Sequence, residues 1–293
     1  MRRVLEISEG SARLSVVNEQ VVATAKDGRT QSISLEDLSG VILTHPGSVL
    51  THASLRAIAE AGALLVVCDT RFCPVGVFLP LLGNQEQGRR MEVQVKASLP
   101  TKKRLWRTIV RSKVRGQAAV LDAVGIDAAP VRAFVEKVRS GDPDNVEAQA
   151  ARRYWPLLMG VAFRRDQGLE GSNALLNYGY TVLRSAVARA LVVVGLHPSF
   201  GLHHRGRFNP LCLADDVMEP FRPRVDRAVF DLTREGFDGV VLGSKEKAFL
   251  VAAVFGSMSV GGEVWSMNQV LLRVAHSLTS VYAGESDQLW LPV

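Results

Sequence analysis

The residues best suited to chemistry lie in one segment, GLHHRGRFNPLCLADDVMEPFRPRV, which runs from Gly201 to Val225. Asp215, Asp216 and Glu219 are close enough in sequence for two carboxylates to share one face of a helix. Like charges at that spacing cost stability unless a cation relieves them. The segment therefore predicts an organised site at which carboxylates meet a cation.

Two histidines, His203 and His204, precede this acidic helix in a turn flanked by glycines. A histidine near carboxylates can be a metal ligand, or it can be a hydrogen-bonded structural or surface residue. Adjacent side chains point in different directions, so we expect at most one of the two to serve the site. The spacing leaves open which one, and in which role.

A further acid, Glu147, lies in the sequence NVEAQAARRYW, which is expected to begin a helix at Asn145. Small alanines surround Glu147 and would let another backbone or a substrate approach closely. Taken alone, Glu147 is an ordinary first-turn glutamate favoured by the helix dipole. Periodicity cannot connect it to His204.

Residues 96–115 contain eight basic side chains and no acidic one. A spacing of three, four and four places four arginines on one helix face, opposite an apolar face. Such a face can simply be solvated, but a stripe without acids favours phosphate contacts. The interpretation as a membrane-surface helix is weaker, because the flanking chain is globular. The candidate DNA-contacting residues are Arg104, Arg107, Arg111 and Arg115, with Arg152 one turn beyond Glu147.

The first 84 residues predict a strand-rich domain. Short runs rich in β-branched residues alternate with turn sequences at Asn18-Glu19-Gln20 and Asp27-Gly28. The apolar runs GVILT and ALLVVCD are typical of buried strands. The expected strands cover residues 4–8, 12–17, 21–25, 30–35, 40–44 and 63–69, with one short helix within 51–62.

From residue 85 onward, helical periodicity dominates and glycine-rich turns separate the segments. The sequence thus predicts an α+β fold. A small β-rich N-terminal domain, residues 1–84, is followed by a larger all-helical domain, residues 85–293, which carries both parts of the acidic constellation. The expected helices cover residues 85–97, 101–124, 129–139, 145–158, 173–194, 210–221, 224–234, 244–258 and 267–282.

The composition narrows the class of protein. Of the 293 residues, 47% are hydrophobic and 22% charged, which is a globular balance, and no run approaches the roughly 20 apolar residues of a membrane span. A cytoplasmic protein without a membrane partner is the expectation. The net charge of +6 favours a polyanionic partner. Cys68, Cys73 and Cys212 are expected to be reduced rather than zinc ligands, since no fourth ligand is evident.

Several motifs in order resemble the family of CRISPR-associated endonucleases that act as adaptation integrases. They are VGVFLP, the NVEAQAARRYW helix, NALLNYGY, and GLHHRGRFNPLCLADDVMEPFRP. The resemblance spans essentially the whole chain. The stretch DVMEPFRP is similar to the branch that accompanies single-protein RNA-guided effectors, the type II systems.

The resemblance implies a set of metal ligands. The family's glutamate in E-A-x-A-A-R falls on Glu147, its histidine at the end of the glycine turn on His204, and the last acid of D-x-x-E on Glu219. Asp216 matches the other acid of that motif and is expected to support the site, while Asp215 stands where the family varies. The implied ion is Mg²⁺ or Mn²⁺, and the histidine favours manganese.

The resemblance also implies a function and partners. It implies insertion of short duplex fragments into a CRISPR array, during antiviral defence, by attack of a 3′-hydroxyl on a phosphodiester. A homodimer is implied, held by the N-terminal domain, together with a small ferredoxin-like partner protein and a contact with the RNA-guided effector nuclease. Two tyrosines of the NALLNYGY segment, Tyr178 and Tyr180, are candidates for orienting DNA, with core packing as the alternative.

Two other functions stay open on the sequence. The chain could be a DNA-binding scaffold of the adaptation complex without chemistry of its own. It could also be a metal enzyme acting on a small molecule, although the arginine stripe argues against this.

Overall fold

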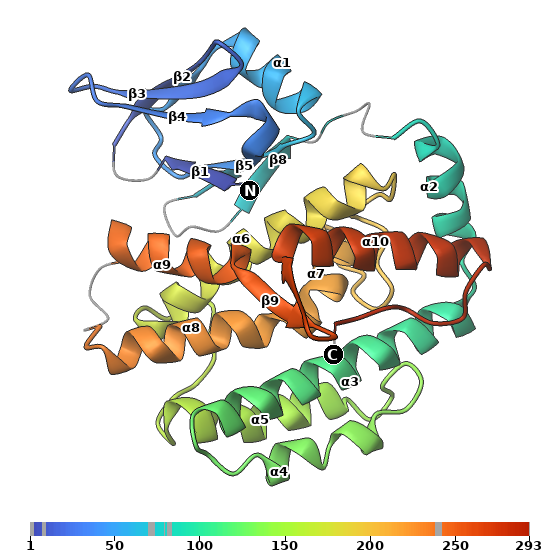
Figure 1. The fold of residues 1–293 in the computed structure, drawn as a ribbon. Helices are drawn as coiled ribbons and strands as arrows, with labels where there is room; N and C mark the ends of the chain where they lie inside the picture. The colour runs from blue at the N-terminus through green and yellow to red at the C-terminus, as the bar shows by residue number, and fades with distance from the viewer. Residues whose placement is uncertain are drawn as a thin grey trace.

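Strands and helices occupy separate parts of the molecule, as the ribbon in Figure 1 shows. The computed structural model describes residues 3–7, 10–69, 74–78, 80, 84–237 and 242–292. The strand-rich N-terminal part lies at one end, and the helices that follow form the larger body. The mixed α+β class expected from the sequence is confirmed. Cys73 and residues 82–83, next to the expected domain boundary, lie outside the described residues.

One sheet of the N-terminal part is a meander joined by tight turns. Strands β2 (Ala12–Val17), β3 (Gln20–Ala25) and β4 (Thr30–Ser34) pair antiparallel, and the short β6 (Val49–Leu50) lies parallel to β2. Positive φ angles of 49° and 57° at Asn18 and Glu19 give the primed turn that matches strand twist. The turn sequence therefore sets the register of the first hairpin.

The second sheet connects the two parts of the molecule. Its strands are β1 (Arg3–Ile7), β5 (Leu38–Leu43), β7 (Leu64–Cys68) and β8 (Pro74–Phe78), in the order β1-β5-β7-β8. Alternate residues face opposite ways, so Val41 and Leu65 enter a small N-terminal core while Ile42 and Leu64 join the core of the helical part. Burial on both faces explains why these strands are continuously apolar. Helix α1 (His52–Glu60) precedes β7.

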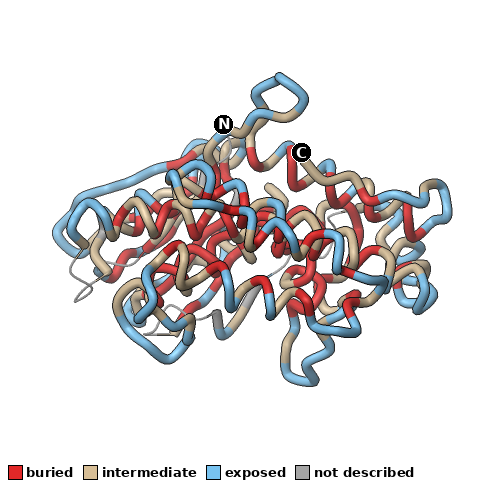
Figure 2. The backbone as a smooth tube through the Cα atoms, turned by 90° about the horizontal axis from the view of Figure 1, so that it is seen from below, coloured by how far each residue is buried: buried red, intermediate tan, exposed pale blue. Residues whose placement is uncertain are grey.

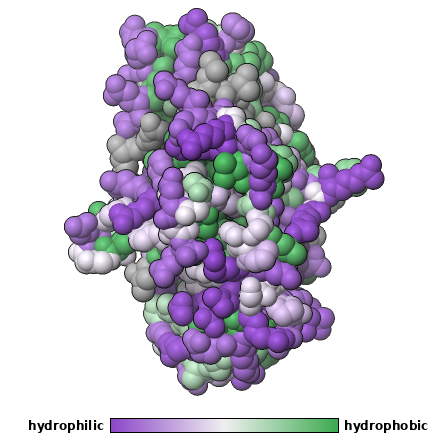
Figure 3. Space-filling view, turned by 90° about the vertical axis from the view of Figure 1, so that its right-hand side faces the viewer, coloured by the Kyte–Doolittle hydropathy of each residue, from purple (hydrophilic) through white to green (hydrophobic). Residues whose placement is uncertain are grey.

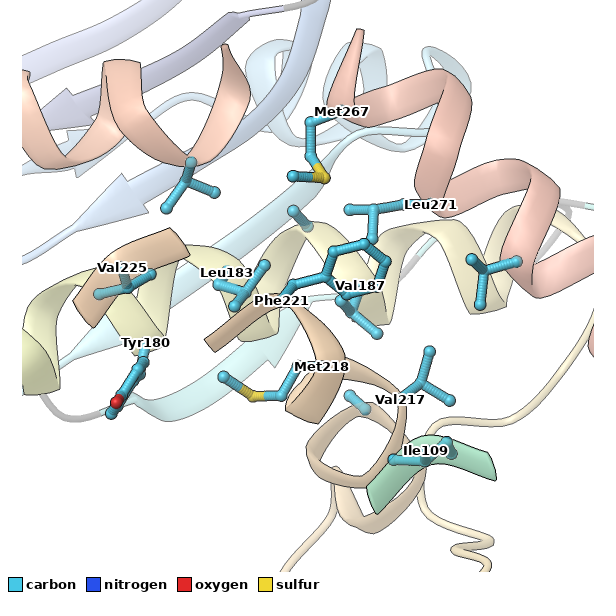
Figure 4. Close-up of a cluster of buried hydrophobic side chains, with 14 of the residues drawn as sticks. Ile109, Tyr180, Leu183, Val187, Val217, Met218, Phe221, Val225, Met267 and Leu271 are labelled. Atoms are coloured by element: carbon cyan, nitrogen blue, oxygen red, sulfur yellow. The ribbon is translucent and has the colours of Figure 1, made fainter. Parts of the chain in front are cut away.

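Helix α6 (Ser172–Val193) is the centre of the helical part, and most of its residues are buried. Four helices pack on it, α7, α8, α9 and α10. Figure 4 shows part of this core, where Leu183 and Val187 of α6 lie near Phe221, Met218 and Leu271.

The other elements are α2 (Gln87–Lys96), α3 (Leu99–Ala123), α4 (Ala129–Arg132), α5 (Val146–Met159), α7 (Cys212–Met218), α8 (Arg222–Arg234), α9 (Ser244–Phe255) and α10 (Met267–Ala283), with 3-10 turns η1 (Leu35–Asp37), η2 (Val135–Lys137) and η3 (Glu219–Phe221).

Two expectations for the helical part were wrong. It is not all-helical, because β9 (Ser257–Val260) and β10 (Glu263–Ser266) form a hairpin closed by Gly261 and Gly262, both with positive φ. The helix expected over 244–258 therefore ends at Phe255. The helix expected over 129–139 is only the short α4, followed by the 3-10 turn η2.

Burial follows this layering. The tube in Figure 2 is red mainly along the central segments and pale blue at turns and outer faces. The face in Figure 3 is dominated by hydrophilic side chains, with hydrophobic ones in small groups. Within the part of the chain that the structure describes, no helix has the length and apolar character needed to cross a membrane.

Candidate active site

The three carboxylates around α7 each meet different basic side chains. An oxygen of Asp215 lies 2.6 Å from Arg184 Nε, and an oxygen of Asp216 lies 2.7 Å from His204 Nδ1. Glu219 is paired with Lys113 and Arg222. The repulsion predicted from their spacing is therefore relieved separately at each acid.

Asp216 fixes the histidine turn onto α7. Its buried carboxylate accepts backbone N–H bonds from Leu202, His203 and His204, at 2.6, 3.1 and 3.2 Å. A side chain at Gly201 would come within 2.9 Å of Asp216 Oδ2, so the turn needs glycine there. The structure places Asp216 against the turn that carries His204, and its supporting role in the site stays a prediction.

The same carboxylate orients the His204 ring. Because Nδ1 lies 2.7 Å from Asp216 Oδ1, Nε2 is left to face other groups. The hydrogen bond to Asp216 raises the pKa of His204, against burial, which lowers it. A histidine whose second nitrogen bonds a carboxylate is the arrangement found around protein-bound metals.

The two histidines do point in different directions. The His203 ring stacks on Trp106, with centroids 4.3 Å apart and an interplanar angle of 3°. The rings of His203 and His204 are nearly perpendicular, at 88°. His203 is thus a packing residue against α3, and His204 is the one linked to the acids.

Glu147 and Glu219 meet at a single atom, Lys113 Nζ. This atom lies 2.5 Å from Glu147 Oε1 and 2.5 Å from Glu219 Oε2. The three side chains come from α5, η3 and α3. Burial lowers the pKa of the Lys113 ammonium, but attraction from Glu219 and Glu147 outweighs it, and the pKa ends above its ordinary value. The structure thus connects Glu147 to Glu219, but it shows no direct contact between Glu147 and His204 among the described residues.

Glu219 is the buried member of this pair. Burial raises the pKa of its carboxyl, but Arg222 and Lys113 more than offset this and hold the pKa below its ordinary value. Arg222 Nε lies 2.7 Å from Glu219 Oε1. The carboxylate is therefore kept charged inside the protein.

The backbone before α5 holds Glu147 at the first turn. Asn145 is left-handed, with φ of 53°, and offers no side-chain cap. Asp142 caps the helix instead, accepting from the N–H groups of Val146 at 2.9 Å and Glu147 at 3.0 Å. This fixes the start of α5 and so the origin of the Glu147 side chain.

Two of the three predicted metal ligands, Glu147 and Glu219, are thus brought together, and the third, His204, is coupled to Glu219 by charge. The negative charge of Glu219 contributes to the raised pKa of His204. Across the described ranges, no group of three or more His, Cys, Asp or Glu side chains is arranged to hold a metal ion. The place between Glu147 and Glu219 is taken by the Lys113 ammonium.

The arginine stripe is less isolated than its sequence indicated. Acids from other segments pair with two of its members, Asp287 with Arg104 at 3.1 Å and Glu136 with Arg111 at 3.5 Å. The expectation of a stripe without acidic partners was therefore wrong. Arg115 and Arg152 are exposed, and Arg107 is half-buried. Contact of any of these arginines with DNA stays a prediction.

Tyr178 and Tyr180 of α6 lie in the hydrophobic core of the helical part. Their hydroxyls donate to Glu6 and to Asp226 respectively. The Arg222 guanidinium lies 4.5 Å from the centre of the Tyr180 ring, so Tyr180 supports a group that holds Glu219. Their placement favours core packing, and a role in orienting DNA stays a prediction.

The buried Asp226 is expected to make the stability of the fold depend on pH. Burial raises its pKa from 3.8 to about 6, in spite of the Tyr180 hydrogen bond. Between these values the folded protein binds more protons than the unfolded chain, so this group makes stability fall as pH rises from about 4 to 6. Asp226→Asn should remove that part of the slope in urea unfolding at pH 4, 5 and 6, and Asp231→Asn should not. Equal slopes in Asp226→Asn and wild type would contradict the assignment.

Sequence reasoning missed Lys113, Trp106 and Asp142 as parts of the site. Lys113 had a visible signal. It stands three residues after Val110 and four after Ile109, on the apolar face of α3. A lysine on a buried face needs an anionic partner, and no acid stands within four residues of Lys113 on its own helix.

Known proteins share this chain's sequence and fold. A model of the family "CRISPR associated protein Cas1" matches residues 5–237. The chain is 38% identical to the CRISPR-associated endonuclease Cas1 of Neisseria meningitidis serogroup C (strain 8013), over 99% of this chain and 95% of that protein.

Solved structures share the fold at low sequence identity. A casposase bound to integration product matches with a TM-score of 0.84 and 19% identity, covering 98% of this chain and 92% of the casposase. A chain of a Cas6-RT-Cas1–Cas2 complex matches with a TM-score of 0.78 and 19% identity, covering 100% of this chain and 36% of that one. With the sequence match, the family is clear: this chain belongs to the Cas1 family of CRISPR-associated proteins.

Proposed function

We propose that this chain is a divalent-metal-dependent DNA endonuclease and integrase of a type II CRISPR system. It inserts short duplex fragments into a CRISPR array by attack of a fragment's 3′-hydroxyl on a phosphodiester. Glu147, His204 and Glu219 are the proposed metal ligands, with Asp216 as the positioning acid.

One observation carries this proposal, the meeting of Glu147 and Glu219 at one cationic atom. Two carboxylates from separate helices both lie 2.5 Å from Lys113 Nζ. Carboxylates placed around a common point, beside a histidine oriented by an acid, suit Mg²⁺ or Mn²⁺. The residues therefore fit the ion, provided that the flexible Lys113 side chain moves aside.

When bound, the ion would stabilise charge on the phosphoryl oxygens and favour loss of the hydroxyl proton. The chain's own residues supply the rest. Asp216 keeps the His204 ring in one orientation, and Arg222 keeps Glu219 charged. These fixed groups would need little rearrangement during the reaction.

The proposed reaction can be tested by removing its nucleophile, the 3′-hydroxyl of the fragment. A duplex fragment with free 3′-hydroxyls should become joined to an array-bearing plasmid in Mn²⁺ or Mg²⁺. The same fragment ending in 3′-dideoxynucleotides should give no joined product, and neither should a reaction with excess EDTA. Joining that persists under either condition would rule out the proposed chemistry.

The arginine stripe carries a prediction about DNA affinity. Arg107→Ala with Arg115→Ala removes two cations, so the plot of log affinity against log salt should become shallower by about 2. Fluorescence anisotropy with a labelled duplex at several salt concentrations measures this. Arg29→Ala, an exposed arginine of the strand-rich part, is the control and should leave the slope unchanged. An unchanged slope in the double variant would remove these residues from the DNA surface.

The domain roles and the partners are proposed from the resemblance to the Cas1 family. Residues 1–84 would form the dimerisation domain and residues 85–293 the catalytic, DNA-binding domain. A complex with a Cas2-like partner is supported by the fold likeness to a chain of a Cas6-RT-Cas1–Cas2 complex. The homodimer and the small ferredoxin-like fold of the partner are proposed from the family resemblance alone. Duplex DNA as substrate is supported by the likeness to a casposase bound to integration product.

A second candidate function is a DNA-binding scaffold of the adaptation complex without its own chemistry. The Lys113 ammonium favours it, because one lysine already pairs with both carboxylates. Under this alternative, Glu147 and Glu219 serve only to hold α3, α5 and η3 together. The variants that open the Discussion separate the two functions.

A further inference from the structure

Phe208 is a large apolar side chain in an unusual place. It is 91% exposed, more than any other aromatic side chain that the structure describes. Leaving a phenylalanine in water forgoes the stabilisation that its burial would give. The ring contributes little to the folded chain, so its use must be sought in what binds there.

The turn that carries Phe208 is firmly held. The N–H of Asn209 donates to Gly206 O at 3.0 Å, which places Arg207 and Phe208 at the tip. The Asn209 side chain is fixed on both sides, by Arg184 at 2.6 Å and by Asp215 at 2.6 Å. A side chain on such a support loses little conformational freedom when it binds.

Helix α7 anchors both this turn and His204, one of the proposed metal ligands. Asp215 of α7 anchors Asn209, while the next residue, Asp216, anchors His204. Phe208 stands only four residues after His204. The exposed ring therefore stands on a loop that α7 holds at Asn209, next to the residue that holds His204.

The charges around the ring select the kind of partner. Residues 203–209 contain two arginines and two histidines but no acid. The Arg207 guanidinium carbon lies 5.7 Å from the Phe208 ring centre. Cations that flank an exposed aromatic ring suit a nucleic-acid strand, which combines phosphates with flat bases. An apolar protein surface would not need the arginines.

We propose that Phe208 stacks on an unpaired base of the DNA next to the reacting phosphodiester, with Arg205 and Arg207 on the flanking phosphates. The inference rests on the proposed DNA function and adds a positioning residue to it. Stacking on one base contributes on the order of tenfold in affinity. Phe208 would thus hold a strand end or branch in register with His204.

The test uses the full chain and a branched DNA with 2-aminopurine at the unpaired position nearest the junction. Wild type should quench the 2-aminopurine fluorescence. Phe208→Ala should lose the quenching and bind this DNA about tenfold more weakly, with little change for a fully paired duplex. Phe208→Trp should retain both properties. Val161→Ala, at a position 93% exposed, is the control and should behave as wild type.

The outcomes separate this inference from the proposed function. Quenching and affinity that are unchanged in Phe208→Ala, while wild type joins DNA, would overturn the stacking alone. Failure of wild type to bind or join any DNA would overturn the proposed function. Phe208→Ala could instead become monomeric in light scattering while its DNA affinity is unchanged. That result would make Phe208 a protein contact and would also overturn the stacking.

Discussion

Glu147→Gln and His204→Ala are each expected to reduce fragment joining by about a thousandfold or more, with little change in DNA affinity. The expected size reflects the loss of a group that acts on charge developing in the transition state. Glutamine keeps the shape of Glu147 and can still bond Lys113, but it removes the negative charge that would hold the ion. The measurement is single-turnover joining on branched DNA in Mn²⁺, with anisotropy for binding.

Two substitutions of the same residue types outside the site serve as controls. Glu92→Gln changes an exposed glutamate that pairs with Lys96 on α2, and it should leave joining unchanged. His52→Ala changes a histidine at the start of α1, in the strand-rich part, with the same expectation. Full activity of Glu147→Gln and His204→Ala in Mn²⁺ would favour the scaffold function.

Lys113→Met is expected to have opposite effects on stability and on metal binding. The lysine side chain is 10% exposed and that of Glu219 is 4% exposed. Methionine removes the ammonium from both glutamates, and Arg222 still pairs with Glu219 but not with Glu147. Removing one partner from a buried ion pair costs about 3 kcal/mol. The melting temperature without metal should fall by several degrees, roughly 2–4 °C for each kcal/mol.

Metal affinity should rise in the same variant, because the ion no longer competes with an ammonium for Glu147 and Glu219. Calorimetric titration with Mn²⁺ should show affinity at least about tenfold higher than wild type, an extra 1.4 kcal/mol. Saturating Mn²⁺ should also restore much of the lost melting temperature. Lys102→Met, on the same helix, is the control. Weaker Mn²⁺ binding in Lys113→Met would show that the lysine assists the ion instead of competing with it.

The parts of the fold that the sequence predicted have strong local signals. Alternating and continuous apolar runs located six strands of the two N-terminal sheets but not β6 or β8, and the positive-φ turn at Asn18-Glu19 set the register of the first hairpin. The β9–β10 hairpin was missed because Met258 continues the apolar pattern of α9. Gly256 and the pair Gly261-Gly262 were the signals that the chain had left the helix.

The site was predictable only in pieces. Spacing indicated carboxylates on one helix face, but it could not join Glu147 to Glu219, which lies 72 positions later (219 − 147). That join depends on how α5 and η3 pack against α3, and tertiary packing leaves no period in the sequence. Resemblance to a family supplied it, and the geometry places both acids on Lys113. The acids that pair with Arg104 and Arg111 were hidden for the same reason.

The most direct test of the metal site is the anomalous scattering of Mn²⁺ in crystals of the full chain. We expect one strong peak between Glu147 and Glu219, with carboxylate oxygens and His204 Nε2 at roughly 2.0–2.3 Å and Lys113 Nζ moved away. A peak bound by other residues, or saturating Mn²⁺ with Lys113 still between the two glutamates, would contradict it.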